Sequence, residues 1–176
     1  DFALYDGDIV SSDGVQLPPS SYLEATNEHV VEHSTAKHCK HKRDSYMVGA
    51  LARVNNNFDK LHPKAQEAAA ALGLSVPCHK PYYISVAQVV EVVHCAYDSI
   101  RIIDEILETG LAEEDRTVEP RAGKGASAVE VPRGILYHCY ELGDDGRIIN
   151  ADCIIPTGQN LANIDADLRE LAPGII

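Results

Sequence analysis

Two short pairs of residues late in the chain each join a proline to a side chain that donates hydrogen bonds, Pro132-Arg133 and Pro156-Thr157. The stretch between them predicts a β-hairpin, because residues 135–142 alternate in the manner of a strand and Asp144-Asp145-Gly146 is a turn signal. Antiparallel pairing brings the entry of the first strand next to the exit of the second. The Arg133 guanidinium and the Thr157 hydroxyl are therefore expected to share one pocket.

Two interpretations of this pocket follow from the residue types. A planar guanidinium and a hydroxyl, each beside a rigid proline, suit a small anionic or polar ligand. The alternative is an ordinary salt bridge of Arg133 and a Thr157 that caps a strand-to-helix junction. Both faces of the strand over residues 135–142 are largely apolar, so the strand itself is expected to be buried.

A second candidate site lies between residues 29 and 43, where histidines, a cysteine and basic residues crowd together. This density of imidazole and thiol groups is one pattern of a metal-binding module. A tight site also needs acidic groups that orient its ligands, and few lie close by in the sequence. A solvated basic connector is therefore the favoured interpretation, and a metal-binding module is the alternative. The residues concerned are His29, His33, His38, Cys39 and His41.

A third candidate site is the glycine-rich stretch Gly123-Lys124-Gly125, which superficially suggests a phosphate-binding loop. The Walker pattern needs a four-residue gap between its glycines and a Lys-Ser/Thr pair, and this stretch has neither. Residues 113–129, which are first charged and then rich in Gly, Ala and Ser, are therefore interpreted as a flexible lead-in to the hairpin.

The composition limits the classes of partner. A net charge of -12 argues against nucleic acid and against an anionic membrane surface. The five cysteines are odd in number, widely spaced and free of any Cys-x-x-Cys pattern, which favours reduced thiols in a cytoplasmic protein. The sequence shows neither an apolar run of the ~20 residues that a membrane span requires nor a signal peptide.

The periodicity of apolar residues predicts an α+β fold, in which a long central helix and shorter helices pack on small antiparallel β-hairpins or sheets. The strongest signal is an apolar stripe at three- and four-residue steps over residues 84–107, with Ser85 as a cap and His94 as a core histidine. We expect further helices over residues 22–31, 63–72 and 161–171, and a buried strand or short helix over 46–55.

The chain length is that of about one domain, so residues 1–176 are expected to form a single domain. Within it we expect a β-hairpin over residues 1–17, a mainly helical part over residues 18–112, and over residues 128–160 the hairpin that carries the candidate site.

The hairpin also carries a resemblance to a known family. Glu130-Val131-Pro132-Arg133-Gly134 followed by His138, and then Pro156-Thr157 with Asn160, resembles a late segment of the large (alpha) subunit of [NiFe] hydrogenases. Upstream segments are similar to the cytoplasmic members of that family, which are linked to NAD(P) or coupled to heterodisulfide reduction. These segments are Leu4-Tyr5-Asp6-Gly7, residues 46–57 with Leu61-His62-Pro63, and Val89 to Cys95.

In that family four cysteinates from two Cys-x-x-Cys motifs hold nickel and iron, because soft thiolates suit this pair of metals. Neither motif occurs in this sequence. The resemblance therefore implies an internal fragment of a longer subunit, which alone is expected to bind no nickel–iron centre and to be inactive.

The resemblance also implies roles for four residues, which we call the canopy: Pro132, Arg133, Pro156 and Thr157. Arg133 is expected to point at the metals and at one cyanide ligand of the iron, in a pocket whose wall Pro132 shapes. Thr157, preceded by Pro156, is expected to donate a hydrogen bond to the other cyanide. The main-chain carbonyl of Cys153 is expected to help bind a magnesium ion, with the Cys153 side chain in the core.

The implied activity of the whole subunit is the reversible oxidation of dihydrogen to protons and electrons, on a nickel–iron centre with cyanide and carbon monoxide ligands. The implied partners are an iron-sulfur small subunit and diaphorase or other electron-transfer subunits. The alternative is a non-catalytic scaffold or assembly module that kept the fold and lost the metal. In either case, faces that meet missing helices are expected to be apolar and exposed, so that the fragment self-associates.

Overall fold

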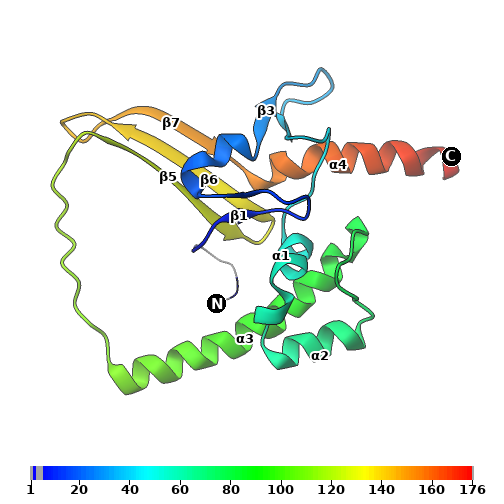
Figure 1. The fold of residues 1–176 in the computed structure, drawn as a ribbon, viewed down its shortest axis with the longest axis horizontal. Helices are drawn as coiled ribbons and strands as arrows, with labels where there is room; N and C mark the ends of the chain where they lie inside the picture. Colours follow the sequence, from blue (N-terminus) through cyan, green and yellow to red (C-terminus); the bar gives the residue numbers. More distant parts are fainter. Residues whose placement is uncertain (1, 3–5, 176) are drawn as a thin grey trace.

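The computed structural model describes residue 2 and residues 6–175, and it has the α+β architecture expected from the sequence (Figure 1). Two short hairpins and a three-stranded sheet lie to one side of a group of helices. The elements in chain order are β1 (Ile9–Val10), β2 (Gln16–Leu17), η1 (Pro19–Glu24), β3 (Asn27–His29), β4 (His38–Lys40), α1 (Ala50–Asn57), η2 (Phe58–Lys60), α2 (Pro63–Ala71), η3 (Pro81–Tyr83), α3 (Ile84–Thr109), β5 (Gly123–Val131), β6 (Gly134–Leu142), β7 (Ile148–Ile154), α4 (Pro156–Leu171) and η4 (Ala172–Gly174).

The predicted β6–β7 hairpin is present, and β6 is the central strand of the antiparallel order β5-β6-β7. The turn at Asp144-Asp145-Gly146 also forms, with Gly146 at φ 74°. The expected burial of β6 holds for one face: Tyr137 and Cys139 are buried, whereas Tyr140 on the other face is 36% exposed. Within residues 2 and 6–175, therefore, the rest of the chain covers one face of the sheet and leaves the other largely open.

The flexible lead-in expected over residues 113–129 is wrong for its second half. Residues from Gly123 onward form β5, which pairs with β6 along its whole length and reaches it through a two-residue turn at Pro132-Arg133. The composition did not predict β5, because Gly, Ala and Ser have low strand propensity. The strand is stabilised instead by its pairing with β6. Residues 111–122 are exposed and carry no helix or strand.

Two apolar clusters form the core. One joins α1, α2 and the first half of α3, and includes Leu51, Val54 and Val90. The other lies between the covered face of the sheet and the short hairpins, and includes Cys39 and Ile154. The helices α1, α2 and α3 and the three-stranded sheet thus have separate apolar cores. Residues that bond the helices to the sheet therefore determine where the candidate site lies.

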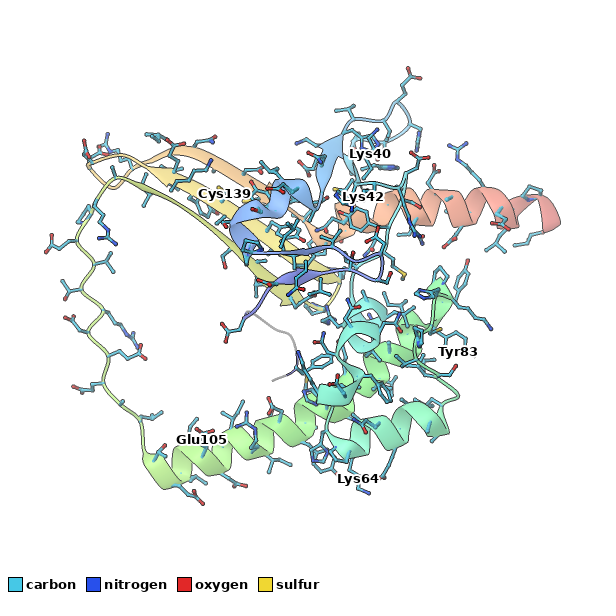
Figure 2. All side chains as sticks on the ribbon, in the orientation of Figure 1. Lys40, Lys42, Lys64, Tyr83, Glu105 and Cys139 are labelled. Atoms are coloured by element: carbon cyan, nitrogen blue, oxygen red, sulfur yellow. The ribbon has the colours of Figure 1, made fainter. Side chains whose placement is uncertain are left out.

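The predicted helix over residues 84–107 is α3, a helix of 26 residues, but its role as a central core helix is wrong for its second half. Ala87 and Val90 are fully buried, whereas Ile100 is 56% and Leu107 77% exposed. The second half extends away from the other helices (Figure 1 and Figure 2). Ser85 makes no capping hydrogen bond, since the helix follows directly on η3.

The helix expected over residues 22–31 is wrong. The chain forms the short η1 and then turns into β3, which pairs with β4. The physical reason is burial: Tyr22 is 4% exposed against the sheet, and Thr26 is 1% exposed with its hydroxyl bonded to that of Tyr46. The supposed basic connector after residue 29 is therefore partly structured, and the part over 18–112 is less helical than expected.

The remaining expectations are mostly confirmed. Residues 9–17 form the β1–β2 hairpin, whereas Leu4 and Tyr5 lie outside the described residues. The ambiguous segment over 46–55 is the helix α1, and the expected helix over 63–72 is α2, with Pro63 in its first turn. The last helix, α4, begins at Pro156, five residues before the expected start at 161. None of the described helices is long and apolar enough to cross a membrane.

Candidate functional site

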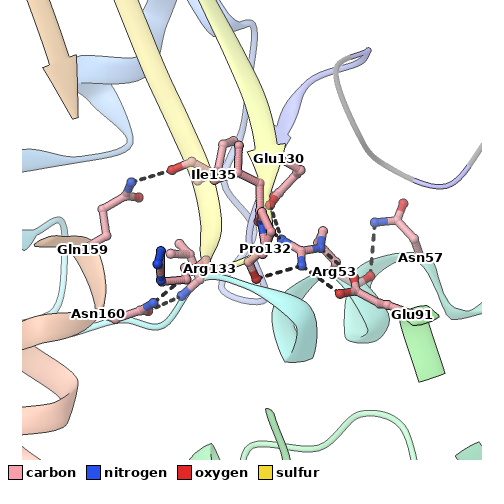
Figure 3. A network of polar contacts seen from close by, with 11 residues as sticks. Arg53, Asn57, Glu91, Glu130, Pro132, Arg133, Ile135, Gln159 and Asn160 are labelled. Carbon is pink, nitrogen blue, oxygen red and sulfur yellow. Dashed lines mark hydrogen bonds and ion pairs between the residues drawn. The ribbon is translucent and has the colours of Figure 1, made fainter. Parts of the chain in front are cut away.

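The candidate site lies where the β5–β6 turn approaches the start of α4. The last pair of the β6–β7 ladder is Tyr137 with Ile154, so the chain beyond it continues in register toward Arg133 on one side and Pro156-Thr157 on the other. Asn160 spans the two segments: its Nδ2 donates to the Arg133 carbonyl oxygen over 3.1 Å, and its Oδ1 accepts from the Val48 amide over 2.8 Å. Figure 3 draws Arg133 beside Asn160 in this position.

Thr157 stands in the first turn of α4, one turn before Asn160. Residues three apart lie on the same face of a helix, so Thr157 faces the side on which Asn160 bonds to Arg133. Pro156 is buried and occupies the first helical position, where a missing N–H costs nothing. Thr157, Pro132 and Arg133 are exposed. The structure thus brings the Arg133 main chain and Thr157 to the same end of the sheet.

Gln159 fixes the start of α4 against β6. This side chain is 1% exposed, and its Nε2 donates to the Ile135 carbonyl oxygen over 2.7 Å (Figure 3). Its Oε1 accepts a hydrogen bond from the Tyr46 hydroxyl over 3.2 Å. A buried amide with both ends bonded leaves little freedom for the helix to shift, because an unmade hydrogen bond in the core is costly.

A buried ion-pair network lies behind the turn, and the sequence reasoning missed it. Arg53 is 5% exposed; it makes two bonds to Glu91, of 2.6 and 2.8 Å, and one of 2.6 Å to Glu130. The same guanidinium donates to the carbonyl oxygens of Val131 over 2.9 Å and of Pro132 over 3.3 Å (Figure 3). One side chain from α1 therefore holds α3, β5 and the backbone that leads into Arg133.

The electrostatics of this network follow from its burial. Loss of water lowers the pKa of Arg53, but the bonds from Glu91 and Glu130 outweigh that effect and leave the pKa raised. Burial raises the pKa of Glu130, although its contact with Arg53 opposes the change. A sequence signal existed: Arg53, Glu91 and Glu130 are each a single charge within an apolar run, and such charges are seldom buried unless paired.

Two glycines let the turn approach α1 closely. A Cβ on Gly134, whose φ is +135°, would lie 2.3 Å from Cγ2 of Val48. A Cβ on Gly49, whose φ is +114°, would lie 3.1 Å from the Arg133 carbonyl oxygen. Both glycines are required by conformation as well as by space. The Pro132-Arg133 turn is consequently held from three directions, by Arg53, by Asn160 and by the start of α1.

Among the described residues, the cysteines do not combine with one another or with His, Asp or Glu side chains into a ligand set of three or more. All five are free, and no group of three or more His, Cys, Asp or Glu side chains within residues 2 and 6–175 is arranged to hold a metal ion. The expectation that the Cys153 side chain lies in the core is wrong, because it is exposed on β7. The binding of magnesium by the Cys153 carbonyl is not tested by this arrangement and stays a prediction.

The histidines divide into two environments. His94 on α3 accepts a hydrogen bond at Nδ1 from the His62 amide over 3.0 Å and packs against the Phe2 ring. Its polar group is therefore satisfied as expected, but the side chain is half-buried at the edge of the core. Burial lowers the pKa of His94. The ring of His38, by contrast, contacts those of His29 and His33 at centroid distances of 6.2 and 5.5 Å. Nothing in the described part of the chain completes these rings into a metal site.

Comparison with known proteins places this arrangement in a context. No protein-family model matches the chain. The chain is 37% identical, over 97% of its length, to the alpha subunit of sulfhydrogenase 1 from Pyrococcus furiosus, and it covers 40% of that subunit. It is 29% identical, over 86% of its length, to the beta subunit of the NAD-reducing hydrogenase HoxS from Cupriavidus necator, of which it covers 33%.

The fold gives the same answer as the sequence. A solved NAD+-reducing [NiFe] hydrogenase in its dihydrogen-reduced state matches with a TM-score of 0.71 and 26% identity, over 93% of this chain and 39% of the matched chain. The chain therefore spans between a third and two-fifths of the length of these relatives.

Proposed function

Because this chain is a homologue of the large (alpha) subunits of [NiFe] hydrogenases, we propose that it is the part of such a subunit that roofs the nickel–iron centre. The proposal rests on this homology together with the position of Arg133. The Arg133 carbonyl oxygen accepts a hydrogen bond from Asn160, which lies about one turn after Thr157 on α4. The proposed reaction of the whole subunit is the reversible oxidation of dihydrogen to protons and electrons.

The side chains present fit the outer surroundings of such a centre and do not fit its ligand sphere. Arg133 and Thr157 are exposed hydrogen-bond donors, as required for recognition of anionic cyanide ligands. The canopy holds no cysteine and the sequence has no Cys-x-x-Cys motif, so the proposal assigns the cysteinate ligands to other parts of the subunit. The bound centre supplies the redox chemistry. The canopy supplies fixed donors, a wall of prolines and, at the Arg133 guanidinium, a group that can hold or pass a proton.

Positioning is the contribution of the residues behind the canopy. A donor aimed at a metal ligand is useful only if its backbone is fixed within a fraction of an ångström. The bonds from Arg53 to the Pro132 carbonyl and from Asn160 to the Arg133 carbonyl provide that restraint. The rigidity of the turn thus supports a role in which the backbone that carries the Arg133 guanidinium stays fixed during the reaction.

The wider setting is part of the same proposal. The whole protein would pair with an iron-sulfur small subunit and with diaphorase or other electron-transfer subunits in the cytoplasm. A magnesium ion, held in part by the main-chain carbonyl of Cys153, would complete the cofactors.

The test uses the full-length large subunit assembled with its small subunit. In Arg133→Lys, loss of the planar fork should lower the turnover of dihydrogen by about 10²–10³-fold, the usual effect of removing one preorganised donor. In Thr157→Val, loss of the hydroxyl should shift the infrared stretching band of one cyanide while nickel content stays at the parent level. Arg169→Lys on the exposed face of α4 and Thr109→Val at the end of α3 are the matched controls.

The alternative, a hydrogenase-like scaffold without metal, predicts a different outcome. The full-length protein would then contain no stoichiometric nickel and would lack the two Cys-x-x-Cys motifs that flank this region in the family. Metal analysis of the purified full-length subunit and its complete sequence separate the two functions. Full nickel content with unchanged turnover in Arg133→Lys would instead refute the role given to the canopy.

A further inference from the structure

Three chemically distinct side chains meet on the uncovered face of the sheet. The Sγ of Cys153 lies 3.4 Å from Nδ1 of His138 and 3.7 Å from the hydroxyl oxygen of Tyr140. The same Nδ1 lies 2.9 Å from that hydroxyl oxygen. A sulfur, a nitrogen and an oxygen thus form a small triangle, with no side chain between them.

The sheet itself builds this triangle. His138 on β6 and Cys153 on β7 are direct cross-strand partners, and Tyr140 follows His138 by two residues, on the same face. Two of the three donors are exposed and His138 is half-buried, so an ion can reach them from solvent. Exposed hydrogen bonds between neutral groups add little to stability, because water competes for them. The fold therefore does not need this arrangement for its own sake.

We propose that Cys153, His138 and Tyr140 form a binding site for a divalent transition-metal ion of the zinc type. Zinc binds nitrogen and oxygen at about 2.0–2.1 Å and sulfur at about 2.3 Å, which places tetrahedral donors roughly 3.3–3.6 Å apart. The distances of 3.4, 2.9 and 3.7 Å between the three donor atoms lie close to these values. An ion at the centre of the triangle would need only small side-chain rotations.

The donor set also selects the kind of ion. A thiolate and an imidazole favour borderline or soft metals such as Zn²⁺ and Co²⁺ over Mg²⁺ or Ca²⁺. The thiol and the phenol would each release a proton to solvent on binding, since a bound cation stabilises their anions. Three protein ligands leave the fourth position open to water. The set shares no residue with the canopy, and it uses the side chain of Cys153, whereas the proposed function uses only the main-chain carbonyl of that residue. The inference therefore stands on the three side chains and does not depend on the proposed function.

The test is a titration of the full 176-residue chain, reduced and under anaerobic conditions, with Co²⁺ alone. One equivalent should give the charge-transfer absorption of a cobalt–thiolate bond, and Zn²⁺ should displace it. Cys153→Ser should abolish the band. His138→Gln and Tyr140→Phe should each weaken binding by about tenfold or more.

Two matched controls identify the site. Cys95→Ser removes another exposed thiol, on α3, and His33→Gln removes a half-exposed imidazole from the group around His38; both should bind Co²⁺ as the parent chain does. Circular dichroism checks that each variant is folded. The proposal is overturned if the parent shows no thiolate band, if the band survives Cys153→Ser, or if either other ligand variant binds with the parent's affinity.

Discussion

At the scale of single residues, the candidate site depends on side chains that the family resemblance does not point to. Arg133 and Thr157 are the residues whose side chains are expected to face a metal centre. Among the described contacts, no hydrogen bond joins these two side chains. Their positions come from Asn160, which bonds to the Arg133 carbonyl, and from Gln159, which bonds to β6. A substitution of Asn160 or Gln159 should therefore change the positions of the canopy residues, although neither amide belongs to the canopy.

His94 supports a prediction at the same scale, on how stability depends on pH. Its Nδ1 accepts a hydrogen bond from the His62 amide, so the ring must stay unprotonated at that atom, and burial lowers its pKa below the ordinary histidine value of about 6.5. A lowered pKa means that the folded state favours the neutral ring. The stability that His94 contributes is therefore fully present above about pH 6.5 and is lost as the pH falls through the folded-state pKa.

The measurement is the urea midpoint of unfolding between about pH 7.5 and about pH 5, a range that includes the ordinary histidine pKa of about 6.5. His94→Asn keeps an acceptor oxygen for the His62 amide but cannot be protonated, so its midpoint should fall less on acidification than that of the parent. His79→Asn, at an exposed histidine, should keep the parent's slope. Equal slopes for His94→Asn and the parent would contradict the prediction.

At the scale of elements, the sequence predicted what is local and missed what is long-range. The helices α2 and α3 were readable because their apolar periodicity and their end signals, Pro63 and Gly110, lie within the segments themselves. The strand β5 was not readable, since its stability comes from pairing with β6. The Arg53 network could not be predicted from the sequence either, because the partners of Arg53, Glu91 and Glu130, lie 38 and 77 residues away.

Arg53 connects α1, α3 and β5, and its removal supports a prediction about how these elements are held together. Arg53→Met leaves two carboxylates, only 13% and 19% exposed, without their cation. Breaking a buried pair in this way should lower the free energy of unfolding by about 3–5 kcal/mol. Adding Glu91→Gln and Glu130→Gln to the same variant should recover part of the loss, because the uncompensated charges are then gone.

The control for Arg53 is another arginine that bonds two carboxylates. Arg101 on α3 pairs with Asp98 and Glu105 but is 56% exposed. Arg101→Met should therefore leave the free energy of unfolding close to that of the parent. Chemical unfolding of the three variants measures the difference. Similar losses for Arg53→Met and Arg101→Met would show that burial of the network does not set its strength.

At the scale of the whole molecule, α3 carries an apolar stripe that no other element covers among the described residues. The stripe on the second half of α3 consists of residues that are half or more exposed, and it extends beyond the helices that cover the first half (Figure 2). An exposed apolar surface of this kind marks an interaction site. A second copy of the chain carries the same stripe, so that two copies can pack against each other through it. The residues are Ile100, Ile103 and Leu107.

We therefore expect the isolated chain to self-associate through α3, against the repulsion of its net charge of -12. Two effects compete: burial of apolar area favours association by roughly 25 cal/mol per Å², and like charges oppose it. Salt screens the charges and leaves the apolar term, so higher ionic strength should strengthen association. An association driven by ion pairs would weaken instead, which makes the salt dependence diagnostic.

Sedimentation velocity over a range of protein and salt concentrations measures this directly. The double variant Ile103→Gln and Leu107→Gln removes the centre of the stripe at constant charge and should shift the species toward monomer. Val118→Gln, at a residue 84% exposed in the segment between α3 and β5, is the matched control and should behave as the parent does. A parent chain that stays monomeric at high concentration and high salt would mean that the stripe does not bind a second copy. Its apolar residues would then have to be explained by contacts within a longer protein.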